Sequence, residues 1–456
     1  MTKKKAIENG THTYSSESGY LTPPSPIKEK LEEFKDMKLG FMVHWGLYQQ
    51  LGIIASWGLI DGRDWNRNKN EYGDRPYWYE NSKQLREEYF SLKNSFNPLR
   101  FNPDEWAELA ADNCFKYLIF TTKHHDGFCM WDTKQTDFKV TDVECPFSKH
   151  KNADIVKGVF EAFRKKNMKI GAYFSKPDWH CDKYWEPDVV DTKPTSSSST
   201  FDPFEEPEKW LAYKDYTYKH LEELVRDYGK IDILWLDGAV EFPHNGRDVM
   251  NGELLNIGEM IDNLRKINPE LIAVDRLGVP EYENYLTPEM KIPDEVISVP
   301  WESCLTLGKN FHYIYDDDYK TPSELIAILL EIVCKGGNLA LNVSPQPDGR
   351  MPRNAIKSLK GFGDWLKKYG EAIFKTRPCA PYKENDVFYT QTKECVYAVT
   401  KNTECDFLSC EHKISKAEHL NTNDLLDFEQ TSGGIKIIPR QKTDEEYAVF
   451  KLYKQL

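Results

Sequence analysis

The chain has 456 residues, of which 40% are hydrophobic and 29% are charged, as in ordinary globular proteins. Its 60 Lys and Arg residues against 73 Asp and Glu residues give a net charge of −13, and no basic block offsets this charge. Nucleic acids and anionic membrane surfaces are therefore poor partners. No run of eighteen apolar residues occurs, which excludes a transmembrane helix.

Residues 1–28 predict a polar N-terminal arm that ends in a Pro-rich connector. The basic start lacks the apolar stretch of a signal peptide, so we expect a cytoplasmic protein, or a secreted or periplasmic one if the start was processed. The ten cysteines form no CxxC pair, and several lie inside apolar runs. This pattern predicts reduced core thiols in a reducing compartment rather than a zinc cluster.

From residue 29 to 377, short apolar runs alternate with amphipathic helices. The runs cover residues 39–46, 117–127, 169–175, 231–238, 271–278, 295–302 and 338–345. Near-continuous apolar runs are typical of strands buried on both faces, as in a parallel sheet. The alternation predicts an α/β fold with a catalytic (β/α)8-like TIM barrel, in which one strand is too weak to identify. A doubly wound sheet is the alternative, but no Gly-rich turn follows the first run.

Helix starts are marked by capping signals. Residues 102–105 and 321–324 each combine a capping residue, a proline and a glutamate, and an apolar stripe at helical spacing predicts a helix over 153–167. A last helix is predicted over 353–370. After residue 377, short alternating strands predict a C-terminal antiparallel β-sandwich domain over 378–456. The Ser- and Pro-rich stretch 191–208 predicts a mobile loop after the third strand.

Functional side chains follow nearly every predicted strand. A TIM barrel builds its active site at the C-terminal ends of its strands, and a purely structural barrel has no reason to gather such groups there. These side chains are His44, Trp45, Lys123, His124, His125, Asp126, Tyr173, Trp235, Asp237, Asp275, Arg276, Trp301 and Glu302.

Asp237 ends a largely apolar run, and Gly238 lets the chain turn sharply beside it. A carboxylate held rigidly in this position can act as a nucleophile toward an anomeric carbon. The alternative is an ordinary aspartate that caps the next helix.

The doublet His124–His125 has three interpretations. Metal chelation is one, but no further ligand follows at a diagnostic spacing. Hydrogen bonding to a polyhydroxylated ligand fits better, because neutral imidazole both donates and accepts, and a buried structural role is the third. Four tryptophans either offer stacking faces to a sugar or pack the rim: Trp45, Trp78, Trp235 and Trp301.

Several ordered blocks resemble glycoside hydrolase family 29, the retaining α-L-fucosidases. The blocks are FMVHWGLYQQ, TTKHHDGFCMWDT, GAYFSKPDW, DILWLDG, VDRLG, TPE, VPWESC and GGNLALNVSPQPDGRMP, and they span about 39–375. The resemblance implies a catalytic barrel with a C-terminal β-sandwich. It also implies an exo-acting hydrolase that releases terminal L-fucose from fucosylated oligosaccharides or glycoconjugates by double displacement, without metal or organic cofactor.

The resemblance further implies residue roles. Asp237 would be the nucleophile. Glu289, in the TPE block, is favoured as the acid/base, with Glu302 as the alternative acid/base or a pocket residue. Asp275, Glu281 and Glu283 are further alternatives for the acid/base. The sugar-binding side chains would be His44, His124, His125, Tyr173, Trp235 and Arg276.

One departure concerns the loop after the first strand, where many relatives carry an acidic residue before a Trp-Tyr pair. Here Tyr77 precedes Trp78, so the loop offers a hydroxyl instead of a charge. The rival interpretations are a related glycosidase acting on α-L-galactosides or only on branched glycans, a non-catalytic sugar-binding relative, and a metal-dependent amidohydrolase. A homo-oligomer remains an open alternative to a monomer.

Overall fold

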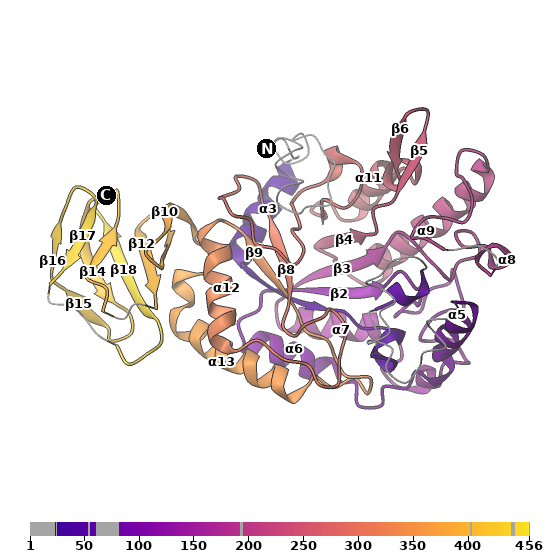
Figure 1. Cartoon of the computed structure of the whole chain (residues 1–456), viewed down its shortest axis with the longest axis horizontal. Coiled ribbons are helices and arrows are strands. Elements are labelled where there is room, and N and C mark those ends of the chain that lie inside the picture. Colours follow the sequence, from indigo (N-terminus) through magenta and orange to yellow (C-terminus); the bar gives the residue numbers. More distant parts are fainter. Residues whose placement is uncertain are drawn as a thin grey trace.

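The computed structural model describes residues 23, 25–52, 55–60, 82–191, 195–401, 404–438 and 443–455. Figure 1 shows a barrel ringed by helices and, beside α12 and α13, a separate set of antiparallel strands at the C-terminal end of the chain. Most of the predicted arm 1–28 and the predicted site residues Tyr77 and Trp78 lie outside the described residues.

The barrel is built on a seven-stranded parallel sheet with the order β7-β4-β3-β2-β1-β9-β8. Apart from Lys169 and Asp237, every strand residue in it is buried, as expected for a sheet covered on both faces. The strands are β1 (Leu39–Val43), β2 (Tyr117–Lys123), β3 (Lys169–Ser175), β4 (Ile233–Asp237), β7 (Ile272–Ala273), β8 (Glu302–Thr306) and β9 (Asn338–Asn342).

Residues 284–290 fill the gap between β7 and β8. Parallel bridges join Val274 to Tyr285 on one side, and Leu286 to Trp301 and Glu289 to Cys304 on the other. The segment therefore occupies the eighth position of the barrel, the one that the sequence pattern leaves unidentified. Together with the C-terminal sheets, this arrangement confirms the predicted fold class.

One predicted strand is displaced. The apolar run 295–302 predicts a strand that ends at Glu302, but β8 begins at Glu302 and pairs it with Asn338, the first residue of β9. Pro300 has no N–H for a sheet hydrogen bond, and the preceding residues run as a loop. Glu302 and Trp301 therefore lie at the N-terminal end of the barrel, opposite the rim at which the sequence analysis places them.

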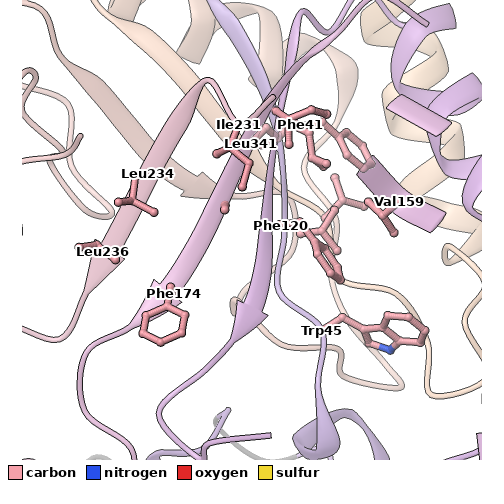
Figure 2. Close-up of a cluster of buried hydrophobic side chains, with 14 of the residues drawn as sticks. Phe41, Trp45, Phe120, Val159, Phe174, Ile231, Leu234, Leu236 and Leu341 are labelled. Carbon is pink, nitrogen blue, oxygen red and sulfur yellow. The ribbon is translucent and has the colours of Figure 1, made fainter. Parts of the chain in front are cut away.

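Two apolar cores lie on the two sides of the barrel wall. Outward side chains such as Phe41, Phe120 and Leu341 pack toward the helices, where Val159 meets them (Figure 2). Inward side chains form a second core that helix α3 (Ser25–Met37) closes from below, with Phe34 against the ring of Tyr117. Because α3 closes the N-terminal end, the cavity that the described residues form in the barrel opens at the C-terminal ends of the strands.

The remaining helices cover the outside of the barrel, and two of their starts are as predicted. Thr321 and Glu324 form a capping box, and the side chain of Asn102 accepts a hydrogen bond from the N–H of Asp104. The helices are α5 (Ser82–Ser91), α6 (Pro103–Asp112), α7 (Ile155–Lys165), α8 (Pro187–Val190), α9 (Pro207–Asp227), α10 (Asn251–Leu254), α11 (Ile257–Ile267), α12 (Pro322–Cys334) and α13 (Arg353–Tyr369).

Two insertions stand at the C-terminal rim of the barrel. A hairpin of β5 (Glu241–His244) and β6 (Arg247–Met250) follows β4, and the ring of His244 stacks on Phe204. Phe204 belongs to the stretch predicted to be a mobile loop. In that stretch the backbone oxygens of Ser197 and Ser198 accept hydrogen bonds from side chains of residues 184 and 185. The two insertions thus form one wall beside the end of β4.

The C-terminal region holds a six-stranded sheet in the order β10-β11-β12-β18-β14-β15 and a three-stranded sheet in the order β13-β17-β16. Their strands are β10 (Arg377–Glu384), β11 (Val387–Gln391), β12 (Cys395–Thr400), β13 (Phe407–Ser409), β14 (Ile414–His419), β15 (Asp424–Leu426), β16 (Phe428–Gln430), β17 (Gly434–Ile437) and β18 (Ala448–Lys454). The division of the chain into domains at 28/29 and 377/378 stays a prediction, although β10 does begin at Arg377.

None of the ten cysteines, all of which lie in the described ranges, forms a disulfide, and nine of them are buried. In the described ranges, no helix is long and apolar enough to cross a membrane.

Candidate active site

A cavity of about 460 Å³ opens at the C-terminal ends of the barrel strands. Its volume is typical of a site for one small molecule. It is lined by Met42, His44, Ala55, Trp57, His124, His125, Tyr173, Pro177, Trp179, Ser197, Trp235, Asp237, Gly238, Ala239, Val240, Arg276, Glu289, Cys304, Asn310, Phe311 and His312.

Asp237 ends β4 with its side chain 19% exposed, in the cavity. The hydroxyl of Tyr173 donates to its Oδ2 at 2.7 Å, and Arg276 Nη1 donates to its Oδ1 at 2.9 Å. Gly238 follows at a φ of +79°, where a Cβ would lie 2.3 Å from the ring of Pro177. Both carboxylate oxygens are thus held by donors that favour the ionised form, and the chain can turn at this point only with glycine.

Arg276 contacts a second carboxylate from its other terminal nitrogen. Its Nη2 lies 2.8 Å from Oε2 of Glu289, whose side chain is 38% exposed. The guanidinium lies 4.3 Å above the ring of Trp235, and its Nε donates to Thr287. Although burial disfavours its charge, Glu289 and Asp237 raise the pKa of Arg276 further above its usual range. One fixed cation therefore brings the two carboxylates of the cavity together.

Three histidines of the cavity each hold their Nδ1 against a polar side chain. The partners are Asn342 Oδ1 for His44, Ser56 Oγ for His124 and Ser175 Oγ for His125.

Two of these contacts fix the tautomer of the histidine. Asn342 Oδ1 can only accept, and Ser175 donates its one hydroxyl proton to the backbone oxygen of Pro177. Nδ1 of His44 and of His125 therefore carries the proton, and each Nε2 is an acceptor.

The same histidines are uncharged. Burial lowers the pKa of His44 and of His124, and it lowers the pKa of His125 to about 4 even though Asp237 opposes the shift. The Nε2 of His125 lies 3.9 Å from Oδ2 of Asp237, beyond hydrogen-bond distance. Neutral imidazoles suit an uncharged polyhydroxylated ligand.

Lys176 is buried next to the backbone of Asp237 and Arg276. Its Nζ donates to the backbone oxygens of Arg276 at 2.6 Å and Asp237 at 3.1 Å, with Leu236 at 3.4 Å. Burial lowers the pKa of Lys176 to about 7, although Asp237 opposes this shift. The lysine ties together the ends of β3 and β4 and the segment after β7, and so it fixes the backbone of both Asp237 and Arg276.

Three of the side chains that the sequence analysis places at the rim, Lys123, Asp126 and Asp275, are buried outside the cavity lining, where they pair with Asp178, Tyr89 and Thr287.

Three further residues that the sequence analysis places in the site do not line this cavity either. Trp45 turns outward and packs against the rings of Phe101 and Trp106, because it follows β1 on the helix-facing side. Trp301 packs at the opposite end of the barrel, where its Nε1 donates to the backbone oxygen of Lys335.

Glu302 is the third. It is fully buried in the barrel interior, below the cavity floor. The hydroxyl of Tyr117 and Nε1 of Trp235 donate to its carboxyl oxygens, at 2.5 and 3.3 Å. Its place follows from the register of β8.

Four aromatic residues of the cavity were not among the predicted site residues. Trp57 packs against His125 and Trp179, and Phe311 against His44. Burial lowers the pKa of the neighbouring His312 to about 4. Phe311 and His312 follow β8 in the chain, so the rule that active-site residues follow barrel strands would have found them had β8 been placed correctly. Trp179 was predicted to be packing only.

Across the described ranges, no group of three or more His, Cys, Asp or Glu side chains is arranged to hold a metal ion.

Comparisons with known proteins agree on one family. The sequence profile of the family described as alpha-L-fucosidase matches residues 9–371. Human tissue alpha-L-fucosidase is 28% identical over 384 residues, which cover 80% of this chain and 74% of that protein. The plasma alpha-L-fucosidase of Rattus norvegicus is 28% identical over 385 residues, covering 80% and 76% of the two chains.

Solved structures give the same result. Alpha-L-fucosidase isoenzyme 1 from Paenibacillus thiaminolyticus matches with a TM-score of 0.76 and 26% identity, over 95% of this chain and all of that one. The Thermotoga maritima alpha-fucosidase in complex with fucose matches with a TM-score of 0.70 and 26% identity, over 92% and 96% of the two chains. The chain therefore belongs to the alpha-L-fucosidase family of glycoside hydrolases, which confirms the family and the retaining fucosidase activity predicted from its sequence.

Proposed function

We propose that Asp237 is the nucleophile and Glu289 the acid/base of a double displacement at a terminal α-L-fucosyl residue. One observation carries these assignments: Nη1 and Nη2 of Arg276 bind the two carboxylates separately, at 2.9 and 2.8 Å. A retaining glycosidase needs two carboxyl groups roughly 5–5.5 Å apart, and two groups on one guanidinium are near neighbours. The resemblance in the TPE block supports the same choice of Glu289.

In the first step, an oxygen of Asp237 bonds to the anomeric carbon while the glycosidic bond breaks. Glu289 gives its proton to the departing oxygen. In the second step, a water oxygen bonds to the anomeric carbon, Glu289 takes a proton from that water, and Asp237 leaves as a carboxylate. Tyr173 and Arg276 keep Asp237 ionised for the attack.

The contact between Arg276 and Glu289 has a consequence for the first step. A neighbouring cation favours the ionised carboxylate, whereas a general acid has to carry a proton. Glu289 must therefore leave the guanidinium before it can act. Entry of the substrate's glycosidic oxygen between the two groups achieves this separation, and the 38% exposed side chain of Glu289 has room to move.

The sugar is held by the neutral histidines and the aromatic walls. The acceptor Nε2 atoms of His44 and His125 take hydroxyl protons from the sugar. The stacked pair Tyr173 and Trp235, with ring centroids 5.3 Å apart, supplies apolar surface at the bottom. A cavity of about 460 Å³ bounded by these side chains suits a terminal sugar unit, which supports exo action.

The predictions on partners and location extend this proposal. Membership of the family supports a fucosylated oligosaccharide or glycoconjugate as the substrate, and the acidic composition supports the prediction that neither nucleic acid nor membrane is a partner. A homo-oligomer and the predicted cytoplasmic location stay predictions.

The decisive experiment is Asp237→Ala assayed on an aryl α-L-fucoside. We expect kcat to fall on the order of 10⁴-fold or more. Added azide should restore turnover, because a small anion can attack from the side that the carboxylate has left. Asp215→Ala, on the exposed face of α9, is the matched control and should leave kcat unchanged. Near-normal activity of Asp237→Ala, or release of fucose with inverted configuration by the wild-type enzyme, would contradict the proposal.

A further inference from the structure

A second cavity, of about 300 Å³, lies beside the first at the rim over the end of β8. Its lining includes Met290, Thr306, Lys309 and Asp318. Three of its residues are chain neighbours of the first cavity's lining: Met290 follows Glu289, Lys309 precedes Asn310, and Thr306 lies two residues beyond Cys304 on the same strand. The two cavities are therefore adjacent on the side of Glu289.

This side is where the leaving group must lie. A general acid has to reach the oxygen that departs, so the part of the substrate beyond that oxygen projects past Glu289. The next residue of the chain, Met290, is 48% exposed and so can pack against a ligand on this side. Its Sδ lies 3.9 Å from the hydroxyl of Thr306, so the side chain sits on the rim over the end of β8.

The loop after β8 carries two opposite charges, Lys309 and Asp318, in the lining of the second cavity. Asp317 accepts hydrogen bonds from the backbone N–H groups of Lys309 and Asp318, both at 2.9 Å. Gly308 lies so close that a Cβ on it would fall 1.9 Å from the Asp317 carboxylate. The loop conformation is thus fixed by internal contacts.

The ends of Lys309 and Asp318 remain available to a ligand. Their charged atoms lie 3.7 Å apart, too far for a hydrogen bond, and the side chains are 64% and 81% exposed. The other two charged groups of the cavity serve the fold, since Lys320 donates to the backbone oxygen of Thr306 and Glu324 caps α12. Two cations and two anions balance, so the cavity carries no net preference for a charged ligand.

We propose that this second cavity is the subsite for the sugar that carries the fucosyl residue, and that this sugar is a neutral pyranose. Lys309 donates to its hydroxyl groups, Asp318 accepts from them, and Met290 packs against the C–H face of the ring. This assignment rests on the proposed roles of Asp237 and Glu289, because they define the side from which the leaving group departs.

The same subsite binds an acceptor in the reverse direction. Once fucose is bonded to Asp237, a hydroxyl oxygen of a sugar in the subsite can replace water. That oxygen bonds to the anomeric carbon, Glu289 takes the hydroxyl proton, the bond to Asp237 breaks, and the product is a fucosylated sugar. Transfer to an added neutral sugar therefore reports on the subsite independently of hydrolysis.

The first test compares two substrates. Lys309→Ala and Asp318→Ala are assayed on an aryl α-L-fucoside and on a fucosylated disaccharide of neutral sugars. The ratio of kcat/KM on the disaccharide to kcat/KM on the aryl fucoside should fall at least ~5-fold in each variant. Lys367→Ala and Asp364→Ala, an exposed pair on α13, are the matched controls and should leave the ratio unchanged.

The second test measures the partition between hydrolysis and transfer when a neutral hexose is added to the aryl fucoside reaction. Lys309→Ala and Asp318→Ala should lower the transferred fraction relative to the wild type. Unchanged ratios and unchanged transfer in both variants would overturn the subsite. That outcome is separate from failure of the catalytic assignments, which would show as activity retained by Asp237→Ala on both substrates.

Discussion

Two carboxyl groups inside the barrel each accept a hydrogen bond from a tyrosine, yet they lie in opposite settings. At the C-terminal end, Tyr173 donates to Asp237, which is 19% exposed to the cavity. At the N-terminal end, Tyr117 donates to Glu302, which is fully buried. The difference is one of access, because only the carboxyl group at the C-terminal end is open to a ligand in the cavity.

The two ends of the barrel also differ in the charge state of the carboxyl group that they favour. Asp237 has the guanidinium of Arg276 at 2.9 Å, and a second carboxylate shares this cation. Burial instead raises the pKa of Glu302 to about 7, although hydrogen bonds from Tyr117 and Trp235 oppose the shift. The upper end thus stabilises a charged carboxylate, whereas the lower end favours a neutral carboxyl group below pH 7.

The largest effect on activity that tests this comparison is expected from replacing Glu289, the proposed acid/base. Glu289→Gln should lower kcat/KM on a poor leaving group, such as a sugar, by about 10³-fold, because proton donation is lost. The loss on an aryl fucoside with a good leaving group should be far smaller. Steady-state kinetics on both substrates measures the contrast.

Glu302→Gln is the internal control for that experiment. Glu302 lies below the cavity floor, so its replacement should affect good and poor leaving groups to the same extent. A strong leaving-group dependence in Glu302→Gln and none in Glu289→Gln would reverse the assignment of the two residues.

A pair of tryptophans, one lining the cavity and one buried behind the barrel wall, extends the comparison. Trp57 lines the cavity against His125, so Trp57→Ala should lower kcat/KM by roughly 10–100-fold with little loss of stability. Trp45 is buried among Phe101 and Trp106 behind the barrel wall, so Trp45→Ala should lower the free energy of unfolding by about 3–5 kcal/mol. Urea unfolding and kinetics on both variants check the pair, and equal stability losses would contradict it.

Much of the barrel was predictable because its strands are continuous apolar runs between capped helices. The eighth position was not, because residues 284–290 carry Pro288 and polar side chains and pair through isolated bridges on both sides. That segment is identified as part of the barrel only by its neighbours in space. The strand predicted over 295–302 was wrong for the converse reason. This run is apolar, but its pairing with β9 starts only at Glu302.

The site was predictable where a side chain directly follows a strand, as His44 and Asp237 do. The sequence could not separate the two candidate acids, because their positions depend on the register that sends Glu302 to the far end and on the contact of Glu289 with Arg276. Trp57 begins a short 3₁₀ helix that does not directly follow a strand, and a segment of this length carries no periodic signal that indicates where a side chain points.

The buried carboxyl group predicts a dependence of stability on pH. Glu302 has a pKa of about 7 in the folded protein against 4.5 as its usual value, so the folded state binds more protons between these pH values. The free energy of unfolding should therefore fall as pH rises from 4.5 to 7, by about 3 kcal/mol for this group. Urea unfolding of wild type and Glu302→Gln across this range isolates the contribution, because the variant lacks it. Parallel curves would show that Glu302 is already ionised.

The smallest effect concerns Trp235, the residue that links the two ends. Its ring stacks on Tyr173 and lies under Arg276 in the cavity, while its Nε1 donates to Glu302 at 3.3 Å. Trp235→Phe keeps an aromatic ring but removes the donor, so the ring loses one constraint on its orientation. We expect kcat/KM to fall roughly 3–10-fold. If the lower end acts on the site through this hydrogen bond, Glu302→Leu, which removes the acceptor, and the double variant should lose activity to the same extent as Trp235→Phe. Additive losses would show that the two ends of the barrel act independently.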